Sequence, residues 1–121
     1  MRQLRFLDWK VYTDARRFFV LVLGIAKSLP KEYRFEITNQ LIRAAFSVVL
    51  NIAEGSGKHS DAELNRFFDI ALGSLFESVA AIDALREAHM VSEKAFLEVE
   101  ASAAEISDQL GGFKRKLRRS L

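Results

Sequence analysis

The sequence predicts an all-α protein that folds as one antiparallel four-helix bundle, and three features support this prediction. Half of the 121 residues are hydrophobic, which is enough to bury a sizeable core. One proline and six glycines are too few for the many turns of a β fold. The chain has the length of a single domain, residues 1–121. Its proline, glycine and capping residues divide it into four helical segments. Short loops between such segments favour an up-down-up-down bundle.

The first two predicted helices cover about residues 8–28 and 34–54. Pro30 cannot stand inside a helix and pushes Leu29 toward extended geometry, so the first helix should end just before them. The second helix should stop at residues 55–57, which read Gly-Ser-Gly, because glycine readily takes the positive φ of a helix cap.

The last two predicted helices cover about residues 60–88 and 92–118. Ser60 and Glu63 form a capping-box pattern, in which hydroxyl and carboxylate would each satisfy a free amide at the helix start. Ser92 is a good N-cap for the fourth helix, and Glu93 would place negative charge at the positive end of the helix dipole.

The apolar pattern differs between the helices. The fourth has a single narrow seam with alternating steps of three and four residues, formed by Phe96, Val99, Ala103, Ile106, Leu110, Phe113 and Leu117. By contrast, residues 18–23 and 67–82 are apolar on more than one face. Because a bundle helix has only one inward face, we expect the surplus apolar surface to bind another copy of the chain. The alternative is that bulky phenylalanines merely widen the core.

Charge is distributed unevenly, although the net charge is only +2. Residues 1–35 carry eight basic and three acidic side chains, whereas residues 61–91 carry two basic and six acidic ones. Five basic residues fall within six positions near the C-terminus: Lys114, Arg115, Lys116, Arg118 and Arg119. Local clusters of this kind can bind nucleic acid despite a small net charge. The alternative is a solvated helix end whose cations complement the helix dipole.

Several functional classes have no support in the residues. The chain has no cysteine, which excludes disulfides and thiolate metal sites and suits a reducing cytoplasm. Its N-terminus lacks the apolar core of a signal peptide. The longest apolar run, residues 18–26, is too short to span a bilayer. We therefore expect a cytoplasmic protein without a membrane partner.

The sequence also gives no support for catalysis or cofactor binding. No glutamate has a histidine three positions later, as the metal sites of di-iron bundles require, and His59 and His89 read as ordinary solvated histidines. The glycine-rich segment that ends at Lys58 lacks the first glycine and the Ser or Thr of a phosphate-binding loop, and it follows a helix instead of a strand. We expect no enzymatic activity, no metal, no cofactor and no small-molecule substrate.

One polar pair stands out in the second predicted helix. Asn51 and Glu54 lie three residues apart on one helix face among apolar neighbours. They could form a binding or acid-base pair. We favour a structural interpretation, a buried hydrogen-bonded unit that fixes the helix against the turn at Gly55, because buried polar groups normally find partners.

Two stretches of the sequence resemble a known family. Residues 40–55, QLIRAAFSVVLNIAEG, and residues 63–77, ELNRFFDIALGSLFE, are similar to the four-helix-bundle proteins encoded in intervening sequences of large-subunit ribosomal RNA genes. Weaker similarity extends over nearly the whole chain. The resemblance implies a homo-oligomeric ring, most simply a homopentamer. The accessory variability determinant proteins of retroelements are also similar, and they imply binding to RNA or DNA.

The resemblance extends to individual residues. It implies that Arg43 and Arg66 are basic helix residues of the family, and that residues 51, 54 and 55 form its Asn, Glu and Gly turn. It supplies no catalytic residue. The chain departs from the family at Ile42, where a second arginine is common, and at Val49, where proline is common. A glycine is common near His89, so His89 should adopt a left-handed cap.

Together these observations predict a non-enzymatic, oligomeric helical bundle that associates with RNA or DNA. The residues expected to contact phosphates are Arg43, Lys58, Arg66, Lys114, Arg115, Lys116, Arg118 and Arg119. The alternative is a protein-protein interaction adaptor or scaffold that binds another protein through its acidic third helix.

Overall fold

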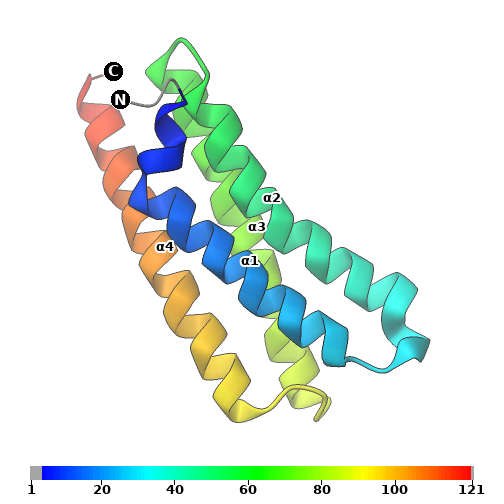
Figure 1. Ribbon diagram of the computed structural model, residues 1–121. Helices are drawn as coiled ribbons and strands as arrows, with labels where there is room; N and C mark the ends of the chain where they lie inside the picture. The colour runs from blue at the N-terminus through cyan, green and yellow to red at the C-terminus, as the bar shows by residue number, and fades with distance from the viewer. Residues whose placement is uncertain (1–3, 121) are drawn as a thin grey trace.

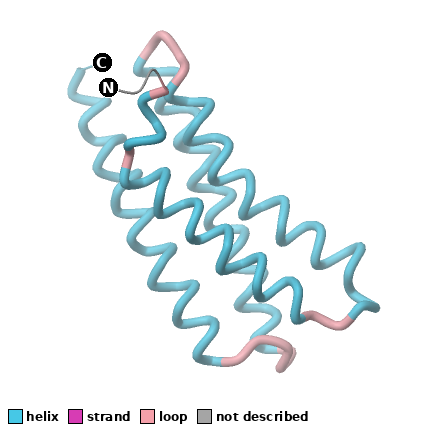
Figure 2. The backbone as a smooth tube through the Cα atoms, viewed as in Figure 1, coloured by secondary structure: helices cyan, strands magenta, loops and turns pink. Residues whose placement is uncertain are grey.

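The described part of the chain is helical throughout. The structure is a computed structural model that describes residues 4–120, with every side chain in that range except those of residues 34 and 118–120. This range contains no strand (Figures 1 and 2). It contains four long helices: α1 (Lys10–Ser28), α2 (Asn39–Ser56), α3 (Asp61–Glu87) and α4 (Glu93–Ser120). It also contains three short ones: η1 (Arg5–Asp8), η2 (Lys31–Tyr33) and η3 (Arg34–Thr38).

The four long helices form an antiparallel bundle. Consecutive helices run in opposite directions and pack side by side, and α4 closes the bundle by packing against α1 (Figure 1). The helix η1 and the end of α4 lie at the same end of the bundle as the loop between α2 and α3. The predicted all-α fold with four helices is therefore confirmed.

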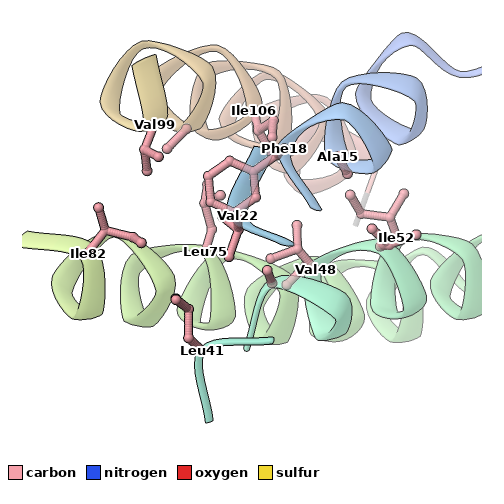
Figure 3. Packing of buried hydrophobic residues seen from close by; sticks show 14 of the residues in the cluster. Ala15, Phe18, Val22, Leu41, Val48, Ile52, Leu75, Ile82, Val99 and Ile106 are labelled. Atoms are coloured by element: carbon pink, nitrogen blue, oxygen red, sulfur yellow. The ribbon is translucent and has the colours of Figure 1, made fainter. Parts of the chain in front are cut away.

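The core is one continuous apolar cluster to which every long helix contributes. The side chains of Phe18, Leu75 and Ile106 come from three helices and point toward one another (Figure 3). Burying a side chain of this size stabilises the fold by about 1.5–3 kcal/mol. The predicted seam of α4 faces this core: Phe113 is half-buried and the other six residues are buried.

The boundary between α1 and α2 is more complex than predicted. As expected, α1 ends at Ser28, and Leu29 is extended with φ −72° and ψ 147°. The α-helical part of α2 begins at Asn39, five residues later than predicted, because η2 is a 3-10 turn and η3 is a π-helical turn. Thr38 already has the helical φ −63° and ψ −44° and provides no side-chain cap. The sequence pattern thus detected helical backbone but not the change in hydrogen bonding.

The loop after α2 does not use glycine as predicted. The helix α2 ends at Ser56, and Gly57 has φ −91° and ψ 0°. No glycine in residues 4–120 takes a positive φ, so that prediction was wrong. Gly55 instead permits close packing, because a Cβ there would lie 3.0 Å from Cβ of Phe67 and 3.1 Å from Cδ1 of Leu64.

The predicted caps are largely present. The hydroxyl of Ser60 accepts a hydrogen bond from the backbone N–H of Glu63 at 3.2 Å, and that of Ser92 accepts one from Ala95 at 3.1 Å. The second hydrogen bond predicted for the capping box, from the free backbone N–H at the helix start to the Glu63 carboxylate, is not formed. That carboxylate accepts from the Arg66 guanidinium at 3.2 Å. Ion pairing with Arg66 has replaced the reciprocal bond.

The end of α3 confirms the prediction for His89. This residue has φ 61°, the only positive φ of a non-glycine residue in the described chain. The backbone N–H of His89 donates to the carbonyl of Arg86, and that of Met90 donates to the carbonyl of Leu85, both at 2.9 Å. These two bonds form a Schellman cap, a position that normally favours glycine.

Candidate functional site

Most of the predicted basic residues gather at one end of the bundle. Lys58 lies in the loop between α2 and α3, Arg66 lies in the second turn of α3, and residues 114–116 lie near the end of α4. We call Lys58, Arg66, Lys114, Arg115 and Lys116 the basic end. The predicted contacts Arg118 and Arg119 continue α4, but their side chains lie outside the described ones.

Two cations of the basic end cover one buried ring. Lys58 Nζ lies 4.8 Å and Arg66 Cζ lies 4.6 Å from the ring centroid of Phe67, which is only 7% exposed. Cations over a ring face are attracted by its quadrupole. This arrangement holds residues from the loop and from α3 next to each other, but the ring is too buried to stack on a nucleobase.

Acidic neighbours neutralise part of the basic end. Arg66 donates to both carboxylate oxygens of Glu63, and this hydrogen bond lowers the pKa of Glu63 and raises that of Arg66. Lys114 forms an ion pair with Asp69 of α3. Arg66 and Lys114 are therefore engaged within the fold, which reduces the charge that they offer to a phosphate.

Arg5 also lies at this end, although no pattern in the sequence marked it as functional. Its guanidinium donates through Nε and Nη2 to the carbonyl oxygen of Ser56, at 3.1 and 2.9 Å. It also lies 5.2 Å from the ring centroid of Trp9. Arg5 thus caps the C-terminus of α2, where a cation satisfies free carbonyls and the helix dipole. No local pattern predicts this contact, because 51 residues separate the two partners.

Arg43 does not belong to the basic end. It lies in the second turn of α2, toward the opposite end of the bundle (Figure 1). There it is exposed and lines a shallow pocket with Phe35, Glu36, Asn39 and Gln40. The structure therefore does not bring Arg43 together with the other predicted contacts.

The predicted buried pair of Asn51 and Glu54 is not formed. Asn51 is half-buried, and its Nδ2 donates to the carbonyl and the hydroxyl oxygens of Ser47, at 2.8 and 2.9 Å. The Ser47 hydroxyl lies 2.9 Å from the hydroxyl of Ser74 on α3. Glu54 is exposed, and its carboxylate is near enough to Arg66 of α3 to contribute to the raised pKa of that guanidinium. The polar unit is therefore Ser47, Asn51 and Ser74, and it links α2 to α3.

Several large apolar side chains remain exposed on the outside of the bundle. They include Val20 on α1, Phe46 and Leu50 on α2, Ile70 and Phe76 on α3, and Leu97 on α4. The predicted surplus apolar surface is thus present in both stretches, 18–23 and 67–82. Phe18, Phe67 and Phe68 are buried, so the alternative that phenylalanines widen the core holds for these three residues but not for Phe76.

The described residues offer no assembled metal or membrane site. No group of three or more His, Cys, Asp or Glu side chains lies close enough together in residues 4–120 to hold a metal ion. In the same range, no helix combines the length and apolarity needed to cross a bilayer.

Comparison with solved structures identifies the fold. The chain is similar to a crystal structure of a protein of unknown function from the S23 ribosomal protein family of Bacteroides thetaiotaomicron. The TM-score is 0.80 at 21% identity, and the match covers 86% of this chain and 97% of that chain. Among curated proteins, none matches the chain significantly.

Comparison with protein families agrees with the resemblance found in the sequence. Residues 7–112 match the family described as 23S rRNA-intervening sequence protein, from η1 into the last part of α4. The matched stretch includes the polar unit between α2 and α3, together with Arg43, Lys58 and Arg66. Because this match covers most of the chain, the protein belongs to the 23S rRNA-intervening sequence protein family.

Proposed function

We propose that this protein is a non-enzymatic helical bundle that assembles with copies of itself and associates with RNA or DNA through its basic end. The observation that carries the proposal is the convergence of basic side chains from the α2–α3 loop, α3 and α4 at one end of the bundle. Such a patch supplies the electrostatic attraction to phosphates that dominates nucleic-acid affinity. The lack of cysteine fits work in the cytoplasm.

Self-assembly would strengthen the binding of nucleic acid by the basic end. Arg66 and Lys114 of the basic end are held in ion pairs, so one copy would bind phosphates weakly. Several copies in one particle would present several basic ends, and their linkage would raise the effective concentration of each. The exposed apolar side chains on all four helices support such association. The family resemblance favours a pentameric ring.

The test is binding of fluorescent single-stranded RNA and DNA to the full chain at several salt concentrations. Lys58, Arg115 and Lys116 are changed together to Gln, which leaves the ion pairs of Arg66 and Lys114 in place. The matched control changes Lys27, Lys31 and Lys94 to Gln, because these are exposed lysines at the other end of the bundle. Both variants lose the same charge.

The proposal expects the basic-end variant to bind more weakly and with a flatter salt dependence. Each lost contact should reduce the log–log slope by about 0.7 on single strands. The control should bind like the unchanged chain. Equal losses in both variants, or no binding by the unchanged chain at about 50 mM salt, would contradict the nucleic-acid part of the proposal.

The alternative function is a protein-binding adaptor. The observation that favours it is the set of exposed acidic residues on α3, namely Asp69, Glu77, Asp83 and Glu87. Capture of partners from lysate with and without nuclease separates the two functions. Partners bridged by nucleic acid disappear after digestion, whereas direct protein partners of an adaptor remain bound.

A further inference from the structure

The outer face of α1 is basic and has an apolar centre. It is formed by Thr13, Arg16, Arg17, Val20, Leu21 and Gly24, and we call it the α1 face. Arg16 and Arg17 are exposed, and Val20 is 66% exposed between them and Gly24. Apart from the adjacent backbone of α1 itself, no atom lies within 4 Å of the position that a Cβ on Gly24 would take. A partner could therefore approach the helix backbone closely there.

A groove between α3 and α4 has the opposite character. This α3–α4 groove has a volume of about 380 Å³, and six of the residues that line it are Phe76, Ala80, Asp83, Glu100, Ala104 and Ser107. The small side chains of Ala80, Ala104 and Ser107 line it together with Phe76, which is 57% exposed. Asp83 is paired with Arg86 at 2.6 Å, whereas Glu100 makes no hydrogen bond or ion pair with any described residue.

The two surfaces match in charge. No acidic side chain lines the depression on the α1 face, and the charged residues that line the α3–α4 groove are Asp83 and Glu100, in residues 4–120. Arg86 lies beside the groove, where its guanidinium covers the ring of Phe96 and pairs with Asp83. They also contain Val20 and Phe76, which are the two most exposed large apolar side chains on α1 to α4. One pairing would therefore cover both apolar residues and bring Arg16 and Arg17 close to Glu100 and to Asp83, which Arg86 only partly neutralises because Arg86 also pairs with Glu93.

We infer that the α1 face of one copy docks into the α3–α4 groove of the next copy. This is a helix-in-groove contact, in which apolar anchors supply affinity and flanking charges set the register. Because the two surfaces differ, the interface is heterologous, and each copy can bind one neighbour on each side. Two α1 faces cannot pair with each other, since their arginines would repel, and the same holds for two grooves. The inference rests on the proposed self-assembly and names its contact surfaces.

Two charge-reversed chains test the pairing. The α1-face variant carries Arg16→Glu and Arg17→Glu, and the groove variant carries Asp83→Lys and Glu100→Lys. Controls with the same changes of sign are Lys31→Glu with Lys94→Glu, and Glu98→Lys, all at exposed positions outside both surfaces. Far-ultraviolet circular dichroism checks that every chain stays helical, and native mass spectrometry at micromolar concentration measures assembly.

Each reversed variant alone should dissociate, with an apparent dissociation constant raised by about tenfold or more, while the controls remain assembled. An equal mixture of the two variants should form mixed complexes in which the two chains alternate. The intact α1 face of the groove variant can bind the intact groove of the α1-face variant, and the two reversed surfaces can bind each other with opposite sign. A single chain carrying all four changes should assemble again, since its surfaces are complementary with reversed sign.

The results separate this inference from the proposed function. If the unchanged chain is a monomer of 13.7 kDa, self-assembly fails and the inference fails with it. If the unchanged chain assembles and both reversed variants assemble equally well, the contact lies elsewhere and only this inference is overturned. If both variants dissociate but their mixture forms no mixed complex, the interface is not the heterologous one described.

Discussion

At the scale of single residues, the most constrained position is Gly55. A side chain there would lie 3.0 Å from Cβ of Phe67 and 3.1 Å from Cδ1 of Leu64, so these residues of α3 would have to shift to make room. Glycine within a helix costs about 1 kcal/mol relative to alanine, so its presence at a buried position of α2 needs a packing reason. Close approach of α2 and α3 is that reason, and it places the loop that carries Lys58 against α3.

Replacing Gly55 with alanine should therefore destabilise the protein. Overpacking of this kind costs about 1–3 kcal/mol, which exceeds the gain in helix propensity. The matched control is Gly73→Ala, because Gly73 is exposed on α3 and no atom lies within 4 Å of its would-be Cβ. That control should gain up to about 1 kcal/mol. Urea unfolding measures both, and a Gly55→Ala chain as stable as the control would contradict the packing argument.

Asn51 and Glu54 should respond differently to removal of their side chains. Asn51→Ala removes the donor that bonds both oxygens of Ser47, and a lost hydrogen bond at a half-buried site costs about 1 kcal/mol. Glu54→Ala changes an exposed position and should alter the free energy of unfolding by less than about 0.5 kcal/mol. Thermal unfolding of both variants measures these changes in the free energy of unfolding. Equal losses would restore the pairing expected from the sequence.

At the scale of helices and loops, the sequence predicts what depends on local patterns. Pro30 ended α1, Ser60 and Ser92 capped α3 and α4, and the heptad-like seam of α4 faced the core, because each depends on residues within a few positions. The π-helical turn before α2 and the carbonyl cap by Arg5 were missed. Both depend on how distant segments pack, which no local pattern records.

The loop between α3 and α4 is strained at one position. His89 occupies a left-handed conformation that costs a residue with a Cβ about 1–2 kcal/mol. His89→Gly should therefore stabilise the protein by about 1 kcal/mol, after the entropy of the more flexible unfolded chain is counted. The control, Ala88→Gly, lies at φ −80° and should be neutral or destabilising. A lower melting temperature for His89→Gly would show that its imidazole makes a stronger contribution than the strain.

The polar contact between α1 and α4 should weaken in acid. Hydrogen bonds from Lys10 and from Gln109 lower the pKa of Asp14. A depressed pKa means that the carboxylate stabilises the fold above its unfolded pKa of about 3.9, and that this contribution is lost as pH falls through the lower folded value. The difference in unfolding free energy between the unchanged chain and Asp14→Asn should thus be largest above about pH 5. A difference that grows toward pH 2 would contradict this.

At the scale of the whole molecule, the candidate site was only partly predictable. The sequence indicated a basic cluster, and the fold adds Lys58 and Arg66 to the end of α4 while separating Arg43 from it. The ion pairs of Lys114 with Asp69 and of Arg66 with Glu63 reduce its strength. The first joins side chains 45 residues apart in sequence. Whether such pairs form depends on helix packing. Counting basic residues in the sequence therefore overestimates the positive charge that the basic end offers.

The central claim is that an assembled particle, not one copy, binds nucleic acid. Native mass spectrometry of the full chain mixed with a single-stranded RNA at low salt tests both parts at once, because assembly and ligand each add a defined mass. The account predicts a closed oligomer near five chains that retains RNA and releases it as salt rises. A chain that stays at 13.7 kDa and carries no RNA would contradict it.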